Sequence, residues 1–188
     1  MTNAELYTAS TLNPGHDREL VAATGLILAH CDQYQAVMGR VRIPWLVIAA
    51  IHFRESGLRF DRHLHNGDPL TARTVHVPAG RPVDGSAPFA WVDSACDALS
   101  DRWKPVPWDL QGALTFLEHY NGTAYRVKHG IASPYVWSYT SAYTSGLYVA
   151  DGEFDPNAVS EQAGCAALFK QLESQGLALD FSVPLASA

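Results

Sequence analysis

The sequence predicts an α+β fold that is mostly helical, and three observations support this. The segment from Ile43 to Ser56 is almost entirely apolar over the length of a helix. Apolar residues recur with helical spacing in several other segments, which indicates amphipathic helices. Residues 57–88 are instead rich in glycine, proline, aspartate and threonine, as loops and short strands are. Helices around one small β-containing part make an α+β domain.

In the first half of the chain, residues 1–13 are polar and are expected to form a loose arm. Apolar positions on one broad face predict a helix from about 17 to 38. The next helix, about 43–56, contains Pro44, which suits a first helical turn, and is followed by Gly57, which commonly ends a helix. Because this helix is apolar all round, we expect it to be buried centrally.

In the second half, residues 73–77 predict a short strand, with one small hairpin in the 57–88 region. Helical spacing predicts further helices at about 88–102, 108–119, 134–143 and 156–175. Asp109 is expected to cap the second of these helices. The last helix is expected to point six residues inward, and residues 176–188 form a tail. The six are Val159, Ala163, Ala166, Ala167, Leu168 and Leu172.

The composition suits one globular domain over residues 1–188, with 1–13 and 176–188 as peripheral arms. The chain has 188 residues and is 47% hydrophobic, enough for a real core. The net charge of −6 argues against a nucleic-acid partner, which usually requires a basic face. No apolar run reaches the roughly 20 residues of a membrane span, so no stable membrane insertion is expected. We expect a monomer.

The cysteines and the N-terminus bear on where the protein is made. Cys31, Cys96 and Cys165 are widely spaced and odd in number, which favours buried thiols over a disulfide framework. The first residues show neither the basic nor the apolar part of a secretory signal. We therefore expect synthesis in the cytoplasm and, for any export, a route without such a signal.

Two carboxylates are candidates for acid–base chemistry. Glu55 ends the apolar helix, where poor solvation raises the pKa of a carboxyl group and lets it donate a proton. Asp68 follows in the turn-like segment 65–68, where we expect an exposed carboxylate with an ordinary pKa. Glycoside hydrolysis uses such a pair. The alternative is that Glu55 is a capping residue or pairs with Arg54 or Arg59.

A group of aromatic residues follows in the second half of the chain. Aromatic rings pack against sugar faces, and phenolic hydroxyls hydrogen-bond at the rim; the alternative is packing at the edge of the core. We expect Tyr120 to contact substrate, followed by Tyr125 and Trp137. The whole group is Tyr120, Tyr125, Tyr135, Trp137, Tyr139, Tyr143 and Tyr148.

Histidines near Asp68 raise the question of a zinc site. His52, His63, His65 and His76 supply suitable ligand types for zinc. The helical His-Glu-x-x-His spacing is absent, however, and histidines two apart on a loop favour surface hydrogen bonds. We therefore expect no metal. No phosphate-binding loop or dinucleotide fingerprint is present, so no cofactor is expected either.

Two short motifs resemble those of goose-type lysozymes and lytic transglycosylases. Phe53-Arg54-Glu55-Ser56 followed by Asn66-Gly67-Asp68 resembles the step that closes their core helix and the loop after it. His119-Tyr120-Asn121-Gly122 resembles a step that lines their cleft. The segments 120–125 and 133–138 also resemble a group of phage and bacterial lysozyme-like proteins, and that resemblance covers most of residues 43–172.

The resemblance implies a lysozyme-like fold in which a small loop or β lobe flanks a glycan cleft. It implies cleavage of peptidoglycan at the β-1,4 bond between N-acetylmuramic acid and N-acetylglucosamine. Glu55 would be the catalytic acid, and Asp68 would stabilise positive charge or position water. Tyr120 and Asn121 would line the cleft. We therefore expect a phage endolysin or a phage-derived bacterial relative. Such a protein acts on the cell wall after release from the host cytoplasm.

One region departs from the goose-type pattern. Residues 70–78 lack the glycine-rich strand of that group, and no acid follows until Asp84. Thr74 or His76 is then a candidate to orient the water. A lytic transglycosylase, in which Glu55 acts as both acid and base and Asp68 is structural, stays open. So do a zinc amidase or peptidase and a non-catalytic glycan-binding or virion-structural protein.

Overall fold

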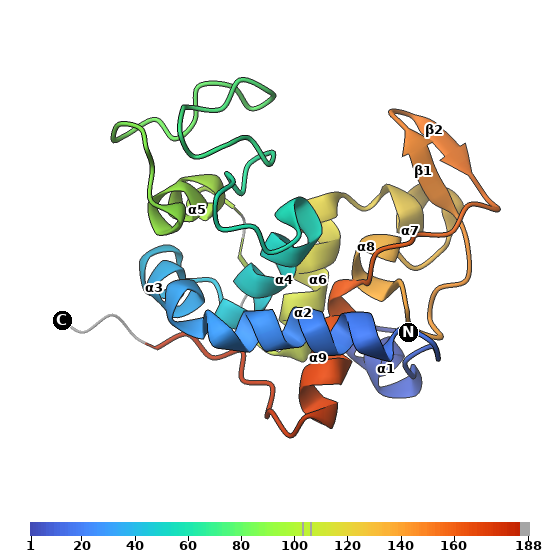
Figure 1. Cartoon of the computed structure of the whole chain (residues 1–188). Coiled ribbons are helices and arrows are strands. Elements are labelled where there is room, and N and C mark those ends of the chain that lie inside the picture. Colours follow the sequence, from blue (N-terminus) through green and yellow to red (C-terminus); the bar gives the residue numbers. More distant parts are fainter. Residues whose placement is uncertain (103, 106, 185–188) are drawn as a thin grey trace. The chain divides into compact units, whose positions relative to one another are not determined.

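The computed structural model describes residues 1–102, 104–105 and 107–184. In this described part the chain forms nine helices and one two-stranded sheet (Figure 1), which confirms the mostly helical α+β class. The chain divides into two compact units. The first unit comprises Met1–Thr24 and Pro105–Leu179, and the second comprises Gly25–Lys104 with the segment that begins at Asp180. A single domain over 1–188 stays a prediction.

The second unit is built on α3 (Cys31–Val41), α4 (Trp45–Ser56) and α5 (Trp91–Leu99), and α3 packs against both of the others. α2 (Asp17–Ala29) contains the boundary between the units. The helix expected over about 17–38 is therefore two helices, separated at His30, whose backbone is not helical. In the described part no single helix is long and apolar enough to cross a membrane; α3 and α4 reach that length and composition only as a pair bent by 111°.

The predicted buried helix is confirmed as α4. All residues from Leu46 to Phe53 are buried. Pro44 is the N-cap, just before the first turn in which it was expected. Gly57 ends the helix in the left-handed conformation, with a φ of 60° that suits glycine. Its N–H donates to the Phe53 carbonyl at 3.1 Å, and the Leu58 N–H donates to the His52 carbonyl at 3.3 Å.

His52 is fully buried within α4. Its Nδ1 lies 3.0 Å from the Tyr34 hydroxyl, so it connects α4 to α3. The imidazole ring packs against Phe60 and Trp91, with ring centroids 4.6 Å and 4.5 Å away. Burial lowers the pKa of His52 to about 4. The core therefore holds a neutral imidazole at neutral pH.

The segment between α4 and α5 is a loop that is held in place by hydrogen bonds from its backbone to its own side chains. The strand expected at 73–77 is wrong, and the 57–88 hairpin is absent from this part of the described chain. The N–H groups of Val75 and His76 donate to the carboxylate of Asp68, so they are not available to a neighbouring strand. Only an isolated bridge between Arg62 and Pro69 forms here.

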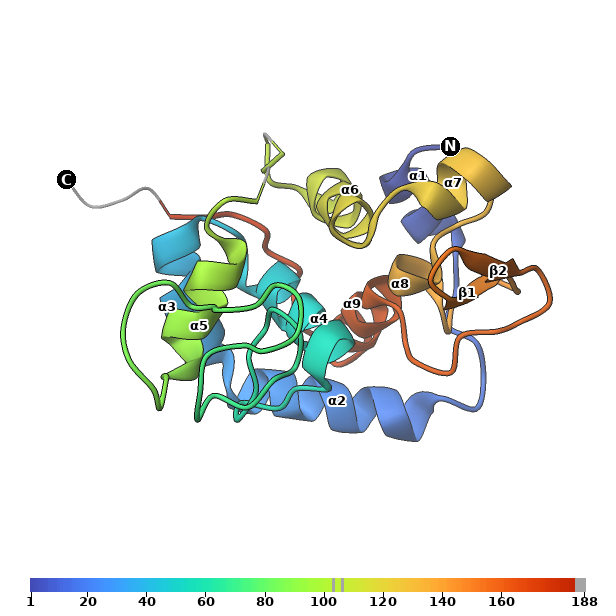
Figure 2. The same ribbon diagram turned by 90° about the horizontal axis from the view of Figure 1, so that it is seen from above.

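The first unit is built around α6 (Leu110–Asn121), which packs against α1 (Asn3–Ala9), α8 (Pro134–Trp137) and α9 (Cys165–Ser174) (Figure 2). α7 (Ala124–His129) follows α6 directly. The predicted cap is confirmed, because the Asp109 carboxylate accepts the Gly112 N–H at 2.7 Å. The buried side chains at the centre are Leu114, Phe116, Leu117, Trp137, Leu168 and Phe169.

The N-terminal arm is helical rather than loose. Thr2 and Glu5 cap α1 reciprocally. Asn3 is buried and donates to the Glu118 carboxylate at 3.1 Å, while Arg126 donates to Asn3 Oδ1 at 2.6 Å. Arg126 also donates to Glu118 at 2.7 Å. This closed network attaches α1 to α6 and α7.

The hairpin lies in a different place from the one expected. β1 (Leu147–Ala150) and β2 (Glu153–Asp155) pair antiparallel across Asp151 and Gly152. Gly152 has a φ of 73°, and an Asp-Gly pair between two strands is a strong hairpin signal. The sequence thus contained the signal that the strand prediction missed.

The last two helices are shorter than predicted. α8 stops before Tyr139, whose positive φ of 66° does not fit a helix. α9 begins only at Cys165, because the backbone before it bonds elsewhere: the Gly164 N–H donates to the Ser138 carbonyl at 2.9 Å. Gly164 lies so close to this segment that a Cβ would be 2.4 Å from the Val136 carbonyl oxygen. Val159 is consequently exposed, whereas the other five residues expected to point inward are buried.

We expect the free energy of unfolding to fall as the pH is lowered from 6.5 to about 4. Over this range the unfolded chain takes up a proton on His52 that the folded core excludes. A pKa difference of this size is worth about 3 kcal/mol. Denaturant unfolding at several pH values measures the slope. His52→Gln, which cannot titrate, should flatten it, and exposed His119→Gln is the matched control. An unchanged slope in His52→Gln would contradict a neutral buried imidazole.

Candidate functional site

Glu55 lies in the last turn of α4, and it is exposed. The predicted burial of this residue is wrong, because the buried part of α4 ends at Phe53 and the following turn emerges from the core. The helix instead supplies a rigid support for a carboxyl group that substrate can reach.

Asp68 is buried and accepts three hydrogen bonds from its own loop. Its Oδ2 accepts the N–H groups of Val75 at 2.8 Å and His76 at 3.0 Å, and its Oδ1 accepts from His76 Nδ1 at 2.6 Å. The bonds from the side chain and then the backbone of His76 hold the pKa of Asp68 well below its ordinary value. The expectation of an exposed carboxylate with an ordinary pKa is therefore wrong.

His76 is the exposed member of this pair, with 77% of its side chain accessible. An ionised carboxylate can only accept, so His76 Nδ1 carries the proton that bonds to Asp68. When the ring is neutral, Nε2 then carries the lone pair. The Asn66 amide donates to the His76 carbonyl at 2.9 Å and fixes the backbone. The pair thus presents a histidine nitrogen of defined tautomer, which can accept a proton from water.

Thr74 is buried, and its hydroxyl closes the neighbouring loop. It donates to the Pro78 carbonyl at 2.5 Å and accepts the Arg81 N–H at 2.9 Å. The Thr74 N–H also donates to the Arg81 carbonyl at 2.8 Å. Because its hydroxyl is occupied, Thr74 does not fit the predicted role of orienting water, and it serves to shape the loop that carries His76.

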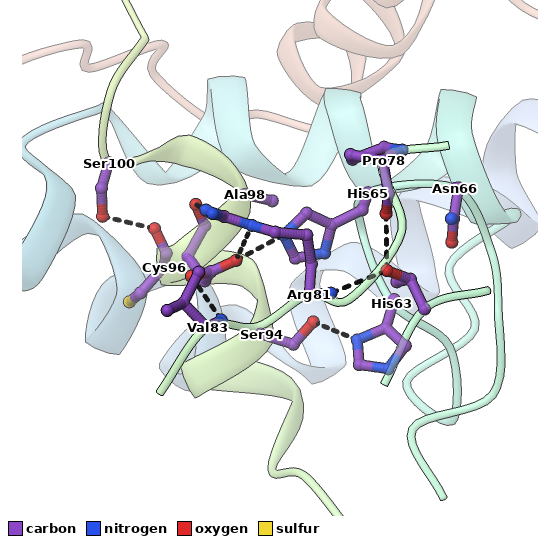
Figure 3. Close-up of polar contacts among 12 residues, drawn as sticks. His63, His65, Asn66, Pro78, Arg81, Val83, Ser94, Cys96, Ala98 and Ser100 are labelled. Atoms are coloured by element: carbon purple, nitrogen blue, oxygen red, sulfur yellow. Dashed lines mark hydrogen bonds and ion pairs between the residues drawn. The ribbon is translucent and has the colours of Figure 1, made fainter. Parts of the chain in front are cut away.

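The other loop histidines have separate partners. His63 Nδ1 lies 2.7 Å from the Ser94 hydroxyl (Figure 3), and its Nε2 lies 2.8 Å from the Ala72 carbonyl. His65 Nε2 lies 2.7 Å from the Asp97 carboxylate. Within residues 1–102, 104–105 and 107–184, no three His, Cys, Asp or Glu side chains are grouped as metal ligands would be. His63 and His65 thus bond to separate partners and not to a shared one.

Tyr120 and Asn121 lie at the end of α6, in the first unit. Tyr120 is half-buried, and its ring centroid is 6.3 Å from those of Phe116 and Tyr135. Asn121 is exposed as the last residue of the helix. Asn121 is therefore open to solvent, whereas the Tyr120 ring is partly covered by its aromatic neighbours.

Tyr125 and Trp137 belong to the core, which corrects their prediction as substrate contacts. Trp137 has no exposed surface. Tyr125 is buried against Tyr148 and Phe154, and its hydroxyl accepts the Tyr148 N–H at 3.2 Å. Their amphipathic rings fill space under the hairpin and around α8, as the packing alternative supposed.

Three of the cavities formed by the described residues each lie within one unit, and none of these three is lined by a residue predicted for the site. One of about 530 Å³ in the second unit lies between α3, α5 and the 82–90 loop. A smaller one, of about 300 Å³, lies beside His65. The third, of about 490 Å³, lies in the first unit beside His16 and Tyr139. No local pattern in the sequence indicated that the residues around this third cavity would come together.

Comparison of the chain with protein-family models, curated proteins and solved structures finds no match. Of the predicted site residues, the structure brings Asp68, Thr74 and His76 together in one loop. Glu55 is carried by the helix that precedes this loop.

We expect Asp68→Ala to release the loop. The amides of Val75 and His76 should exchange with solvent much faster, because the carboxylate that accepts them is gone. Asp61→Ala removes an exposed carboxylate paired with Arg59 and is the matched control. Hydrogen exchange followed by NMR measures both. Equal protection in Asp68→Ala and wild type would contradict the proposed loop closure.

The same loop should lose stability in acid. The pKa of Asp68 is lower in the folded chain than its ordinary value of 3.8, so its contribution is present above about pH 4. It is lost as the pH falls further and the carboxylate takes up a proton. Wild type should therefore lose more stability below pH 4 than Asp68→Asn, as thermal unfolding at a series of pH values can test.

Proposed function

We propose that this chain cleaves peptidoglycan at the β-1,4 bond between N-acetylmuramic acid and N-acetylglucosamine, as a lysozyme-like muramidase. The observation that carries the proposal is the position of Glu55, an exposed carboxyl group on the last turn of the buried helix α4. The resemblance of residues 53–56, 66–68 and 119–122 to goose-type enzymes supports it. The lysozyme-like fold itself is part of the proposal.

Glu55 acts as general acid. Its carboxyl proton goes to the glycosidic oxygen while the bond from that oxygen to C1 breaks. Buried residues and the Gly57 cap hold α4 in place, so the backbone that carries Glu55 has little freedom. Binding of a sugar strand over the exposed group would remove water from it, and loss of water favours the protonated form of a carboxyl group.

His76 activates the water in a hydrolytic reaction. Its Nε2 takes the proton as the water oxygen attacks C1, and Asp68 stabilises the imidazolium through Nδ1. Asp68 therefore positions His76 and does not itself contact the sugar. This assignment replaces the original expectation that Asp68 directly positions water.

A lytic transglycosylase is the second candidate, and a specific observation favours it. Asp68, the second carboxylate of the predicted pair, is buried and occupied by its own loop. In a transglycosylase no water is needed: Glu55 donates its proton, and then accepts one from the sugar 6-hydroxyl as this oxygen closes onto C1. The product then has a 1,6-anhydro end instead of a reducing end.

Glu55→Gln should lower turnover of purified peptidoglycan by about 10²- to 10⁴-fold while the fold is retained, because the general acid is lost. Release of soluble fragments, with far-UV circular dichroism as the folding check, measures this. Asp61→Asn, an exposed carboxylate in the same unit, is the control and should keep full activity. Full activity in folded Glu55→Gln would end the assignment. Binding of sacculi without fragments from wild type would identify a non-catalytic glycan-binding protein.

His76→Gln separates the two reactions. If hydrolysis is correct, the fragments from wild type carry reducing ends and the variant loses most of its rate, because the water loses its base. Mass spectrometry of the fragments identifies the ends. Anhydro ends with an unchanged rate in His76→Gln would instead identify a transglycosylase. His129→Gln, in α7 and outside the residues predicted for the site, is the matched control.

A further inference from the structure

The first unit contains a polar cavity that the proposed chemistry does not use. Its volume is about 490 Å³, within the range of small-molecule pockets. Nine residues line it: Asn13, His16, Ser138, Tyr139, Tyr143, Thr144, Val159, Ser160 and Glu161. Because they come from three separated segments, the cavity exists only in the folded unit.

The N-terminal segment crosses the 138–144 segment at the base of this cavity. Leu12 and Thr140 form an antiparallel bridge, and the Asn13 N–H donates to the Tyr139 carbonyl at 2.9 Å. The Tyr139 hydroxyl bonds to the Glu161 carbonyl and to the Glu19 carboxylate, the latter at 3.1 Å. Tyr139 also has a positive φ of 66°, which non-glycine residues rarely adopt. The surroundings therefore hold the tyrosine ring in one orientation.

His16 stacks on this fixed ring. The two ring centroids are 3.5 Å apart and the planes differ by 17°. His16 is half-buried, so part of the imidazole faces the cavity that it lines. The tyrosine thus supports a second ring, which supplies both a flat surface and nitrogen atoms for hydrogen bonds.

Polar groups around this surface have hydrogen-bonding capacity to spare. Asn13, His16, Thr144 and Glu161 are among the residues that line the cavity. In the hydrogen bonds and ion pairs formed by the described residues, these four side chains have no protein partner. By contrast, the hydroxyls of Ser138, Tyr143 and Ser160 are occupied by backbone groups. The cavity therefore offers an amide, an imidazole, a hydroxyl and a carboxylate to a ligand.

The residue types that line the cavity indicate which class of ligand it can bind. The lining contains no lysine or arginine, and it contains a carboxylate, so anions such as phosphate are disfavoured. Among the lining residues Val159 is the only aliphatic one, so an apolar ligand would leave polar groups unpaired. A neutral ligand rich in hydroxyl groups, with one flat face, satisfies both conditions.

We propose that this cavity binds a saccharide ring, as a glycan-binding site additional to the one that contains Glu55. The choice of an N-acetylated sugar rests on the proposed function. The Glu161 carboxylate and the Asn13 amide accept and donate hydrogen bonds at the sugar hydroxyls, while the apolar face of the sugar lies against His16. Such a site would retain the enzyme on its polymeric substrate between cleavage events.

Titration of the ¹⁵N-labelled full chain with tri-N-acetylchitotriose tests this. The chain carries Glu55→Gln so that the sugar is not cleaved. We expect the amide signals of Tyr139, Thr144 and Glu161 to shift, and His16→Ala or Glu161→Gln to weaken that binding about tenfold. His129→Ala is the matched control, because His129 stacks in a similar way on Phe154 in the same unit, with ring centroids 3.6 Å apart. It should leave the affinity unchanged.

The outcomes separate this site from the proposed function. Shifts confined to residues outside the cavity, or equal affinities in His16→Ala and His129→Ala, would overturn the site even if peptidoglycan is cleaved. Shifts at the cavity that His16→Ala and Glu161→Gln weaken would support it, even if wild type releases no fragments. Glu161 is exposed, and glutamine is nearly isosteric with glutamate, so a loss of binding in Glu161→Gln does not arise from unfolding.

Discussion

The removal of α4 from water is the constraint on which the second unit depends. From Leu46 to Phe53 the helix has no exposed residue, so it cannot be placed at a surface. Each large apolar side chain buried there contributes about 1.5–3 kcal/mol. The same burial requires the single polar ring, His52, to be neutral and bonded to Tyr34. The position and direction of α4 are therefore fixed before any functional group is considered.

The C-terminal end of α4 places Glu55 at the surface, next to the buried part of the helix. Gly57 stops α4 with backbone bonds to its last carbonyls, so the chain leaves the core within one turn. Glu55 lies in that turn, and its exposure follows from where the apolar residues stop. The sequence predicted the helix, its end and the residue that it carries. It did not predict the exposure, because periodicity shows which residues are apolar and not how far the covering layer extends.

The 57–90 loop was beyond prediction for a different reason. Its order comes from Asp68 and Thr74, whose side chains take up backbone groups several residues away. Such contacts leave no periodic pattern, and the alternation at 73–77 indicated a strand whose N–H groups are in fact used by Asp68. The cap at Asp109 was predictable because its partner, Gly112, lies at the spacing that helix geometry dictates. Sequence patterns therefore predicted the contacts between residues close together in the chain and missed those between residues far apart.

Accessibility, more than residue type, selects the histidine that can act. His63 accepts from the Ser94 hydroxyl at Nδ1, because its Nε2 must donate to the Ala72 carbonyl. A serine activated by a histidine is a nucleophile in many enzymes, yet both side chains here are fully buried and can meet no substrate. The Asp68–His76 pair has the opposite arrangement, with its carboxylate buried and its imidazole open. Among the paired histidines of the loop, this exposure makes His76 the one suited to transfer a proton to or from a ligand.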